Sequence, residues 1–255
     1  EHRDLHYPLR RQRQMCIRDS ASSVFEGERA YGGKIFKELE HTERLIRSAN
    51  TLGFNIPYGI EEICKIRKDV LEANNITDGY IRPVAWRGSE MMGISAQENT
   101  IHFAVAAWKW PSYFSPEAKL KGIKLNISKW RRPDPTTAPV NTKAAGLYMI
   151  CTLSKHEAEN QGFDDSLMLD YRGYIAEATG ANIFFVKNDE IYTPIADCFL
   201  DGITRQTVIE IAKKENFKVT ETRLKIENLS KFSECFVTGT AAEVTPVKSI
   251  NEIEF

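Results

Sequence analysis

The sequence predicts a two-domain α+β protein in which mostly antiparallel sheets are flanked by helices. Apolar residues recur at helical spacing in residues 41–54, 59–76 and 201–217. Residues 166–195 instead alternate strand-like apolar runs with tight-turn residues. A segment with two prolines at 111–122 separates the first group of elements from the second. Helices beside antiparallel strands on both sides of this boundary indicate an α+β fold with two domains.

The first half is expected to form a small α/β domain over residues 21–113. The stretch "HTERLIRSANTLGF" predicts a helix that ends at a glycine, and "GIEEICKIRKDVLEANNI" predicts a second helix with charges between its apolar positions. "GYIRPVAWRG" and "TIHFAVAAWKW" predict two strands, because they are rich in β-branched and aromatic residues. Residues 114–122 are the expected linker between the domains.

The second half is expected to form a large domain over residues 123–255. "IKLNISKW" predicts its first strand, and the pattern from Ala144 to Gly162 predicts a helix with a glycine just past its end. Another helix is expected directly after Gly202. "ECFVTGTAAEVTPVKSI" predicts a strand, a turn of small residues and a second strand.

The composition excludes several classes of function. The chain has 255 residues, of which 42% are hydrophobic and 27% charged, an ordinary balance for a globular protein. The net charge of -1 provides no basic field for nucleic acid, and no apolar run approaches the length of a bilayer span. The five cysteines form no CxxC pair and the five histidines no ligand spacing. This pattern argues against a metal site and favours a reducing cytoplasm.

Both ends of the chain depart from the pattern of the rest. "PLRRQRQMCIRDS" is basic and has neither an apolar period nor the apolar core of a signal peptide. Residues 1–20 are therefore interpreted as a non-native segment. At the other end "SINEIEF" stops directly after a strand-like run, so the large domain is expected to be C-terminally truncated.

Lys143 is the first candidate for chemistry. It precedes the small residues "AAG", and small neighbours allow a large group to come close to an amine. A lysine becomes a nucleophile near neutral pH when burial or a neighbouring cation lowers its pKa, and its usual use is a Schiff base to an aldehyde cofactor. The alternative is a solvated lysine at a helix start, where its charge opposes the helix dipole.

Glu177 is the second candidate. It lies between Ala176 and Ala178 beside an apolar strand, so it is expected to be buried. A buried carboxylate needs a cationic partner. The sequence leaves two partners open: a protonated pyridine nitrogen, or an arginine in an ordinary salt bridge.

Two segments have the features of phosphate cradles. "DGITRQ" places Gly202, Ile203 and Thr204 at a helix N-terminus, where free N–H groups and the helix dipole favour an anion. "TGTAAE" offers backbone N–H groups with little side-chain bulk, and also the hydroxyl of Thr240. An ordinary helix cap and an ordinary turn are the alternatives.

A series of motifs in one order resembles the branched-chain amino acid aminotransferases, which are pyridoxal-phosphate enzymes of fold type IV with a D-amino acid aminotransferase-like fold. The motifs extend over about residues 22–248 and are "SSVFEGERAY", "HTERL", "YIRP", "TKAAGLY", "EATGANIF", "GITR" and "GTAAEVTPV". The resemblance implies an enzyme that moves the amino group of L-leucine, L-isoleucine or L-valine to 2-oxoglutarate, with pyridoxal 5'-phosphate as cofactor. It also implies a cytoplasmic homodimer or higher homo-oligomer without nucleic-acid or membrane partners.

The resemblance assigns cofactor roles to particular residues. Lys143 is the implied Schiff-base lysine and proton shuttle, and Glu177 the implied partner of the pyridine nitrogen. Tyr148 is expected to donate to the ring oxygen, and Arg44 to bind the phosphate. The rest of the implied phosphate site consists of Thr240 and the backbone N–H groups of Ile203 and Thr204.

The resemblance also assigns substrate roles. The α-carboxylate is expected at Tyr80 and the backbone of Thr240 and Ala241, and the γ-carboxylate of glutamate at Arg82. The implied walls of the apolar side-chain pocket are Phe25, Trp110 and Tyr113, with core packing as the alternative for all three, and Ile94 is expected to enter this pocket from a partner subunit.

One segment departs from the family. "RQMCIRDSA" stands where the family has a strand that ends in a tyrosine–glycine turn, so the partner-subunit tyrosine has no equivalent here. Three alternatives to a branched-chain aminotransferase remain: a D-amino acid aminotransferase, an aminodeoxychorismate lyase, and an inactive truncated relative.

Overall fold

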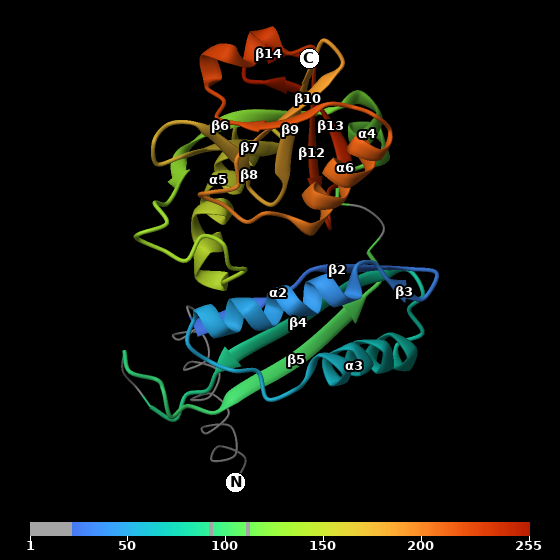
Figure 1. The fold of residues 1–255 in the computed structure, drawn as a ribbon, viewed down its shortest axis with the longest axis vertical. Coiled ribbons are helices and arrows are strands. Elements are labelled where there is room, and N and C mark those ends of the chain that lie inside the picture. The colour runs from blue at the N-terminus through green and yellow to red at the C-terminus, as the bar shows by residue number, and fades with distance from the viewer. Residues whose placement is uncertain (1–21, 92–93, 111–112) are drawn as a thin grey trace. The chain divides into compact units, whose positions relative to one another are not determined.

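The computed structural model describes residues 22–91, 94–110 and 113–255 (Figure 1). The chain divides into two compact units. Unit 1 consists of Glu1–Lys109 and Thr142–Gly146, and unit 2 of Trp110–Asn141 and Leu147–Phe255. The short segment that carries Lys143 therefore belongs to unit 1, although unit 2 residues precede and follow it in the sequence. The interpretation of residues 1–20 as non-native lies outside the described residues.

Unit 1 contains a five-stranded antiparallel sheet with β4 at its centre. Strand β4 pairs with β1, β2 and β5, and β2 pairs with β3. The strand bounds are β1 Ser23–Phe25, β2 Glu28–Tyr31, β3 Lys34–Ile35, β4 Gly79–Arg87 and β5 Ile101–Trp108. Both strands predicted in this half are thus confirmed as β4 and β5.

Two helices cover the sheet of unit 1 (Figure 1). They are α2, Glu38–Thr51, and α3, Ile60–Ala73, as their apolar spacing predicted. Helix α2 ends just before Gly53, whose positive φ of 76° is easily reached only by glycine. The core that α2, α3 and the sheet share contains these buried residues: Val24, Leu45, Ala49, Phe54, Ile56, Ile63 and Ala85.

Unit 2 contains a nine-stranded sheet in which six strands close into a ring. The strand order is β11-β10-β9-β12-β13-β6-β7-β8, and β8 also pairs with β9, so that β9, β12, β13, β6, β7 and β8 form the ring. The strand bounds are β6 Ile123–Arg132, β7 Asp165–Asp170, β8 Ile175–Ala178, β9 Asn182–Lys187, β10 Glu190–Pro194, β11 Val219–Thr222, β12 Glu234–Gly239, β13 Glu243–Ile250 and β14 Ile253–Glu254. Most pairings are antiparallel, and only β10–β11, β13–β6 and β6–β7 are parallel among the described strands.

The helices of unit 2 begin and end at recognisable signals. Helix α5, Met149–Asn160, follows a 3-10 turn at Ala145–Tyr148 and ends before Gly162, whose φ is +82°. Helix α6, Ile203–Lys214, starts directly after Gly202. A short 3-10 helix covers Ile226–Lys231. None of the helices that the structure describes is both long enough and apolar enough to span a lipid bilayer.

The expected linker at 114–122 has a different structure from the one predicted. It contains helix α4, Pro116–Lys121, and it lies within unit 2. The Ser115 hydroxyl caps this helix by accepting a bond from the Ala118 N–H at 3.1 Å, and Pro116 occupies the first turn. Proline fits a first helical turn because its missing N–H would be unpaired there anyway. Pro116 therefore marks the start of a helix within unit 2.

Candidate active site

The backbone of Lys143 is held between strand β1 and helix α2. The Phe25 N–H donates to the Lys143 carbonyl at 3.1 Å, and the Lys143 N–H donates to the Ser48 hydroxyl at 3.1 Å. An isolated β-bridge joins Val24 to Ala144. These bonds attach the backbone of Lys143 to unit 1, beside strand β1, which lies in the motif "SVFEG".

The amine of Lys143 lies among charged and aromatic groups. Its Nζ is 4.8 Å from the centroid of the Phe25 ring, and the guanidinium carbon of Arg82 is 4.6 Å from the same ring. Burial lowers the pKa of the Lys143 amine to about 8; Arg44 and Arg82 also lower it, while Glu26 and Tyr80 oppose them. A fraction of the amine is therefore neutral, and nucleophilic, near neutral pH.

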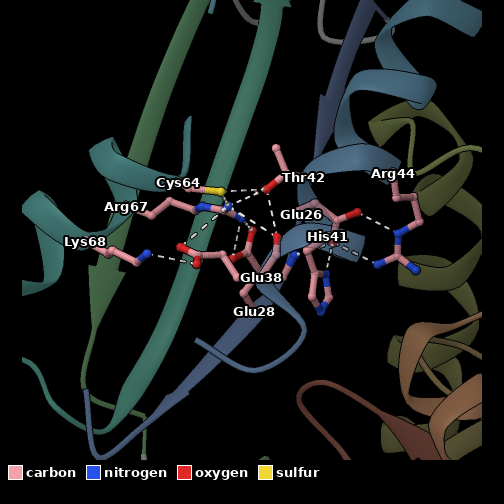
Figure 2. Close-up of polar contacts among 10 residues, drawn as sticks. Glu26, Glu28, Glu38, His41, Thr42, Arg44, Cys64, Arg67 and Lys68 are labelled. Carbon is pink, nitrogen blue, oxygen red and sulfur yellow. Dashed lines mark hydrogen bonds and ion pairs between the residues drawn. The ribbon is translucent and has the colours of Figure 1, made fainter. Parts of the chain in front are cut away.

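Arg44 is anchored by a buried carboxylate (Figure 2). Its Nε donates to Glu26 Oε1 at 2.7 Å and its Nη2 to Glu26 Oε2 at 2.8 Å. His41 Nδ1 lies 2.7 Å from Glu26 Oε2. Burial alone would raise the pKa of Glu26, but Arg44 and His41 outweigh it and hold that pKa far below its usual range. Glu26 is therefore ionised throughout the physiological range.

Arg82 and Tyr80 lie side by side on strand β4. Arg82 Nη2 donates to the Tyr80 hydroxyl at 2.9 Å, and the Tyr80 ring packs on Trp108 with centroids 5.1 Å apart. A Cβ at Gly27 would lie 1.9 Å from that hydroxyl, so any side chain at this position would displace the Tyr80 ring. Glu90 is a nearby acid in the sequence, and its carboxylate accepts from the Thr100 N–H at 3.2 Å. The Arg82 guanidinium instead contacts the Tyr80 hydroxyl and the Phe25 ring.

Glu177 in unit 2 has an arginine partner. The Nε of Arg132 lies 3.3 Å from Glu177 Oε1, and Asn182 Nδ2 donates to Glu177 Oε2 at 3.2 Å. Glu177 is 8% exposed and Arg132 4%. The salt bridge that the sequence left open is therefore present.

Asn182 connects Glu177 to the start of helix α6. Its Nδ2 also donates to the Leu200 carbonyl at 3.1 Å, and its Oδ1 accepts from the Gly202 N–H at 3.1 Å. Helix α6 has no side-chain cap and no acidic residue in its first turn. A helix start of this kind leaves the N–H groups of Ile203 and Thr204 to bind an anion.

The end of strand β12 lies next to Asn182. Thr238 pairs with Asn182 across the strands, as Glu177 does on the other side, so the three side chains share one face of the sheet. The Thr238 hydroxyl is buried and has no hydrogen-bond partner among the residues that the structure describes. Thr240 and Ala241 follow in the turn and are partly exposed.

The remaining predicted residues of unit 2 lie in two places. Tyr148 directly precedes helix α5 and interacts electrostatically with Arg132. Trp110 and Tyr113 pack edge to face with ring centroids 5.9 Å apart. Burial raises the pKa of the Tyr113 phenol to about 12, so this phenol stays neutral.

The chain matches known proteins over almost all of the described residues. The model of the family described as "Amino-transferase class IV" matches residues 23–250. The chain belongs to the class IV aminotransferases. The predicted family, the α+β fold of type IV and the assignment as a transaminase are thereby confirmed.

Named relatives of this aminotransferase fall in the branched-chain group. The "Probable branched-chain-amino-acid aminotransferase" of Rickettsia bellii is 52% identical over 231 residues, which cover 91% of this chain and 78% of the relative. The T.th. branched-chain amino acid aminotransferase with pyridoxamine 5'-phosphate has a TM-score of 0.90 and 39% identity, over 94% of this chain and 80% of that one.

The T.th. enzyme is also known in complexes with two different ligands. Its structure complexed with N-(5'-phosphopyridoxyl)-L-glutamate has a TM-score of 0.88 to this chain, and its structure complexed with 4-methylvaleric acid has one of 0.87. Both are 38% identical to this chain and cover 94% of it, with 80% of the T.th. chain matched in each.

Sequence reasoning missed several polar residues of this aminotransferase that contact predicted site residues. They are Glu26, His41, Ser48, Arg132 and Asn182. The available signal was the pair of acids in the apolar run "SVFEGERAY", because a carboxylate in a buried strand requires a cation. Nothing in the sequence around Arg132 or Asn182 distinguishes them from ordinary strand residues. Ile94, expected to reach a partner subunit, is fully exposed on this chain.

Proposed function

We propose that this chain transfers the amino group of L-leucine, L-isoleucine or L-valine to 2-oxoglutarate with pyridoxal 5'-phosphate as cofactor. One observation carries the proposal. The Lys143 amine, with a pKa of about 8, is fixed beside Arg44, Arg82 and Phe25 in unit 1. A surface lysine would be almost wholly charged, whereas a larger fraction of this amine is in the neutral form that imine chemistry needs.

The residues present fit the cofactor in three ways. An aldehyde requires an amine of lowered pKa, which Lys143 provides. Each unit has a group of the kind that binds phosphate: the uncapped start of α6 in unit 2 and the Arg44 guanidinium in unit 1. A buried hydroxyl requires a partner, and the Thr238 hydroxyl lacks one among the described residues, on the sheet face that carries Glu177.

Each cofactor residue is proposed to have a defined role. When bound, pyridoxal 5'-phosphate supplies an electron-withdrawing ring that stabilises negative charge at the substrate Cα. Lys143 attaches the cofactor and moves the proton from Cα. Glu177 holds the proton on the ring nitrogen, and Tyr148 donates to the ring oxygen. The phosphate is bound by Arg44, Thr240 and the N–H groups of Ile203 and Thr204.

The substrate residues are proposed to serve two different side chains. Phe25, Trp110 and Tyr113 form apolar walls for a branched side chain, and Arg82 receives the γ-carboxylate of glutamate. Tyr80 and the backbone of Thr240 and Ala241 hold the α-carboxylate. The two T.th. complexes support this dual use, since one ligand contains glutamate and the other is a branched aliphatic acid.

The proposal extends to a cytoplasmic homo-oligomer that acts on small molecules. Its support is the resemblance to the branched-chain group, together with reduced-thiol chemistry: all four cysteines that the structure describes are free. Light scattering of the purified chain at several concentrations measures the oligomeric state directly. A monomer at all concentrations would contradict the oligomer.

A substrate panel tests the function. We expect the purified chain, supplied with pyridoxal 5'-phosphate and 2-oxoglutarate, to form glutamate from L-leucine, L-isoleucine and L-valine. Lys143→Ala should abolish this turnover, because no other group supplies both the attachment and the proton transfer. Faster turnover of D-amino acids would instead favour a D-amino acid aminotransferase, and cleavage of aminodeoxychorismate a lyase. Failure to bind the cofactor, seen as no visible absorbance, would favour an inactive relative.

A further inference from the structure

Glu26 is the most completely buried acid next to the candidate site. Its side chain is 0% exposed, and both carboxylate oxygens are used by helix α2 (Figure 2). Arg44 reaches both oxygens, at 2.7 and 2.8 Å, and His41 Nδ1 lies 2.7 Å from Oε2. None of the roles proposed above uses this carboxylate.

The same stretch of backbone connects Glu26 to Lys143. Glu26 follows Phe25, whose N–H donates to the Lys143 carbonyl, and Ser48 of α2 accepts from the Lys143 N–H. His41, Arg44 and Ser48 are spaced by three and four residues and so lie on one face of α2. Glu26 therefore ties the helix that carries Arg44 to the strand that anchors Lys143.

We propose that Glu26 is a positioning residue that holds the Arg44 guanidinium and the His41 imidazole in fixed places beside Lys143. The inference rests on the proposed roles of Lys143 and Arg44. A bidentate carboxylate–guanidinium pair fixes the plane of the guanidinium as well as its distance. An arginine with a long flexible side chain would otherwise adopt several rotamers, and ordering it would weaken binding of an anion.

Charge gives Glu26 a second effect on Lys143. The groups that act on its amine include Arg44 and His41 from α2, Tyr80 and Arg82 from β4, and Glu26 itself. Burial and Glu26 act on His41 in opposite directions, and the net result lowers the pKa of its imidazole, which is therefore neutral. Glu26 is then the carboxylate that offsets two arginines around the amine. Its removal should make the amine lose its proton at a lower pH.

The alternative is that Glu26 only stabilises the fold, and unit 1 contains a matched control for it. Glu28 lies two residues further and is also 0% exposed, with Arg67 Nη1 at 2.6 and 2.7 Å from its two oxygens (Figure 2). Arg67 also donates to Thr42, Cys64 and the Glu38 carbonyl, and none of these three is a proposed site residue. Glu28→Gln thus removes a second fully buried acid, whose ion pair is with Arg67 and does not include Arg44.

The experiment compares Glu26→Gln, Glu26→Asp and Glu28→Gln in the full chain. The first readout, on cofactor-free protein, is the pH midpoint at which Lys143 becomes reactive toward a trace acylating reagent, followed by mass spectrometry of its peptide. The second is the Kd for pyridoxal 5'-phosphate from fluorescence titration. We expect Glu26→Gln to lower the midpoint by about one pH unit and to weaken binding at least about tenfold. Glu28→Gln should change neither.

Glu26→Asp keeps the charge on a shorter side chain. We expect its midpoint to stay nearer to that of the parent while its affinity falls, because only the geometry of the Arg44 pair is disturbed. Equal effects of Glu26→Gln and Glu28→Gln on both readouts would overturn the proposal, as would an unchanged midpoint in Glu26→Gln. A shifted midpoint in a chain whose parent fails to bind pyridoxal 5'-phosphate would support the placement of Glu26 and contradict the proposed function instead.

Discussion

At the scale of single residues, Arg82 in unit 1 and Glu177 in unit 2 differ in the charge of their neighbours. Arg82 lies against the Tyr80 hydroxyl and the rings of Tyr80 and Phe25, which carry no formal charge. Glu177 lies against Arg132 and Asn182, so a cation is already present beside it. The different neighbours lead to different expectations for removing each charge.

Arg82→Ala should damage the half-reaction with glutamate more than the half-reaction with leucine. In the proposed function, both substrates place their α-carboxylate at the same anchor, so their side chains would enter the same space. Leucine needs only apolar walls, whereas the second carboxylate of glutamate is costly to bury without a cation. Loss of such a charge-assisted pair costs about 2 to 4 kcal/mol, so kcat/KM for glutamate should fall roughly 30-fold or more. Stopped-flow measurement of each half-reaction checks this. Equal losses of kcat/KM for glutamate and leucine would contradict the proposed role of Arg82 toward glutamate.

Glu177→Gln should slow the chemical step more than it weakens cofactor binding. An amide cannot hold a proton on a ring nitrogen, so charge at the substrate Cα is less well stabilised. We expect kcat to fall about tenfold or more, with saturation by pyridoxal 5'-phosphate verified by absorbance. Because Arg132 is buried and loses a charged partner, thermal unfolding should be measured in parallel. Unchanged kcat with bound cofactor would show that Glu177 serves only the salt bridge.

At the scale of elements, the start of helix α6 requires a glycine at position 202. A Cβ at Gly202 would lie 2.2 Å from Asn182 Oδ1, which accepts the Gly202 N–H. The side-chain amide of Asn182 also donates to Glu177 and to the Leu200 carbonyl. The position of α6 and the orientation of Glu177 therefore depend on the same asparagine.

Gly202→Ala should displace Asn182 and so disturb both groups that Asn182 contacts, the start of helix α6 and the Glu177 carboxylate. Its φ of −68° is accessible to alanine, so the cost arises from the contact and not from backbone strain. We expect weaker cofactor binding, about tenfold in Kd, and a destabilisation of about 1 to 3 kcal/mol. Gly180→Ala is the control, because nothing lies within 4 Å of a Cβ there and no positive φ is involved. Equal behaviour of the two variants would contradict this account.

At the scale of the whole molecule, unit 1 buries two acids, Glu26 and Glu28, each in an ion pair with an arginine. Glu26 and Glu28 lie two residues apart, and burial together with Glu26 raises the pKa of Glu28 to about 7, although Arg67 opposes this. Arg44 and His41 hold the pKa of Glu26 far below its usual range. The two acids therefore contribute to stability with opposite dependence on pH.

Acid should destabilise unit 1 through Glu26. A carboxyl whose pKa is depressed in the folded state contributes stability above its unfolded pKa, near 4.5, and that stability is lost as the pH falls further. The raised pKa of Glu28 acts oppositely: its contribution to stability is full below about 4.5 and is lost as the pH rises through about 7. Hydrogen exchange of α2 peptides should show protection falling between about pH 4.5 and 3 in the parent. The fall should be shallower in Glu26→Gln, and an equally steep fall in that variant would contradict the assignment.

Much of this protein was determined by the sequence alone. Helices α2, α3, α5 and α6 follow local apolar spacing and glycine stops, which act over a few residues and are readable from them. Lys143 could be singled out because its small neighbours are adjacent in sequence. The tertiary structure alone decided the partners: Glu26 meets Arg44 across 18 positions, and Arg132 meets Glu177 across strands of one sheet. Buried charges find their counterions through chain packing, and the identity of a partner brought close by a sheet or helix leaves no local pattern.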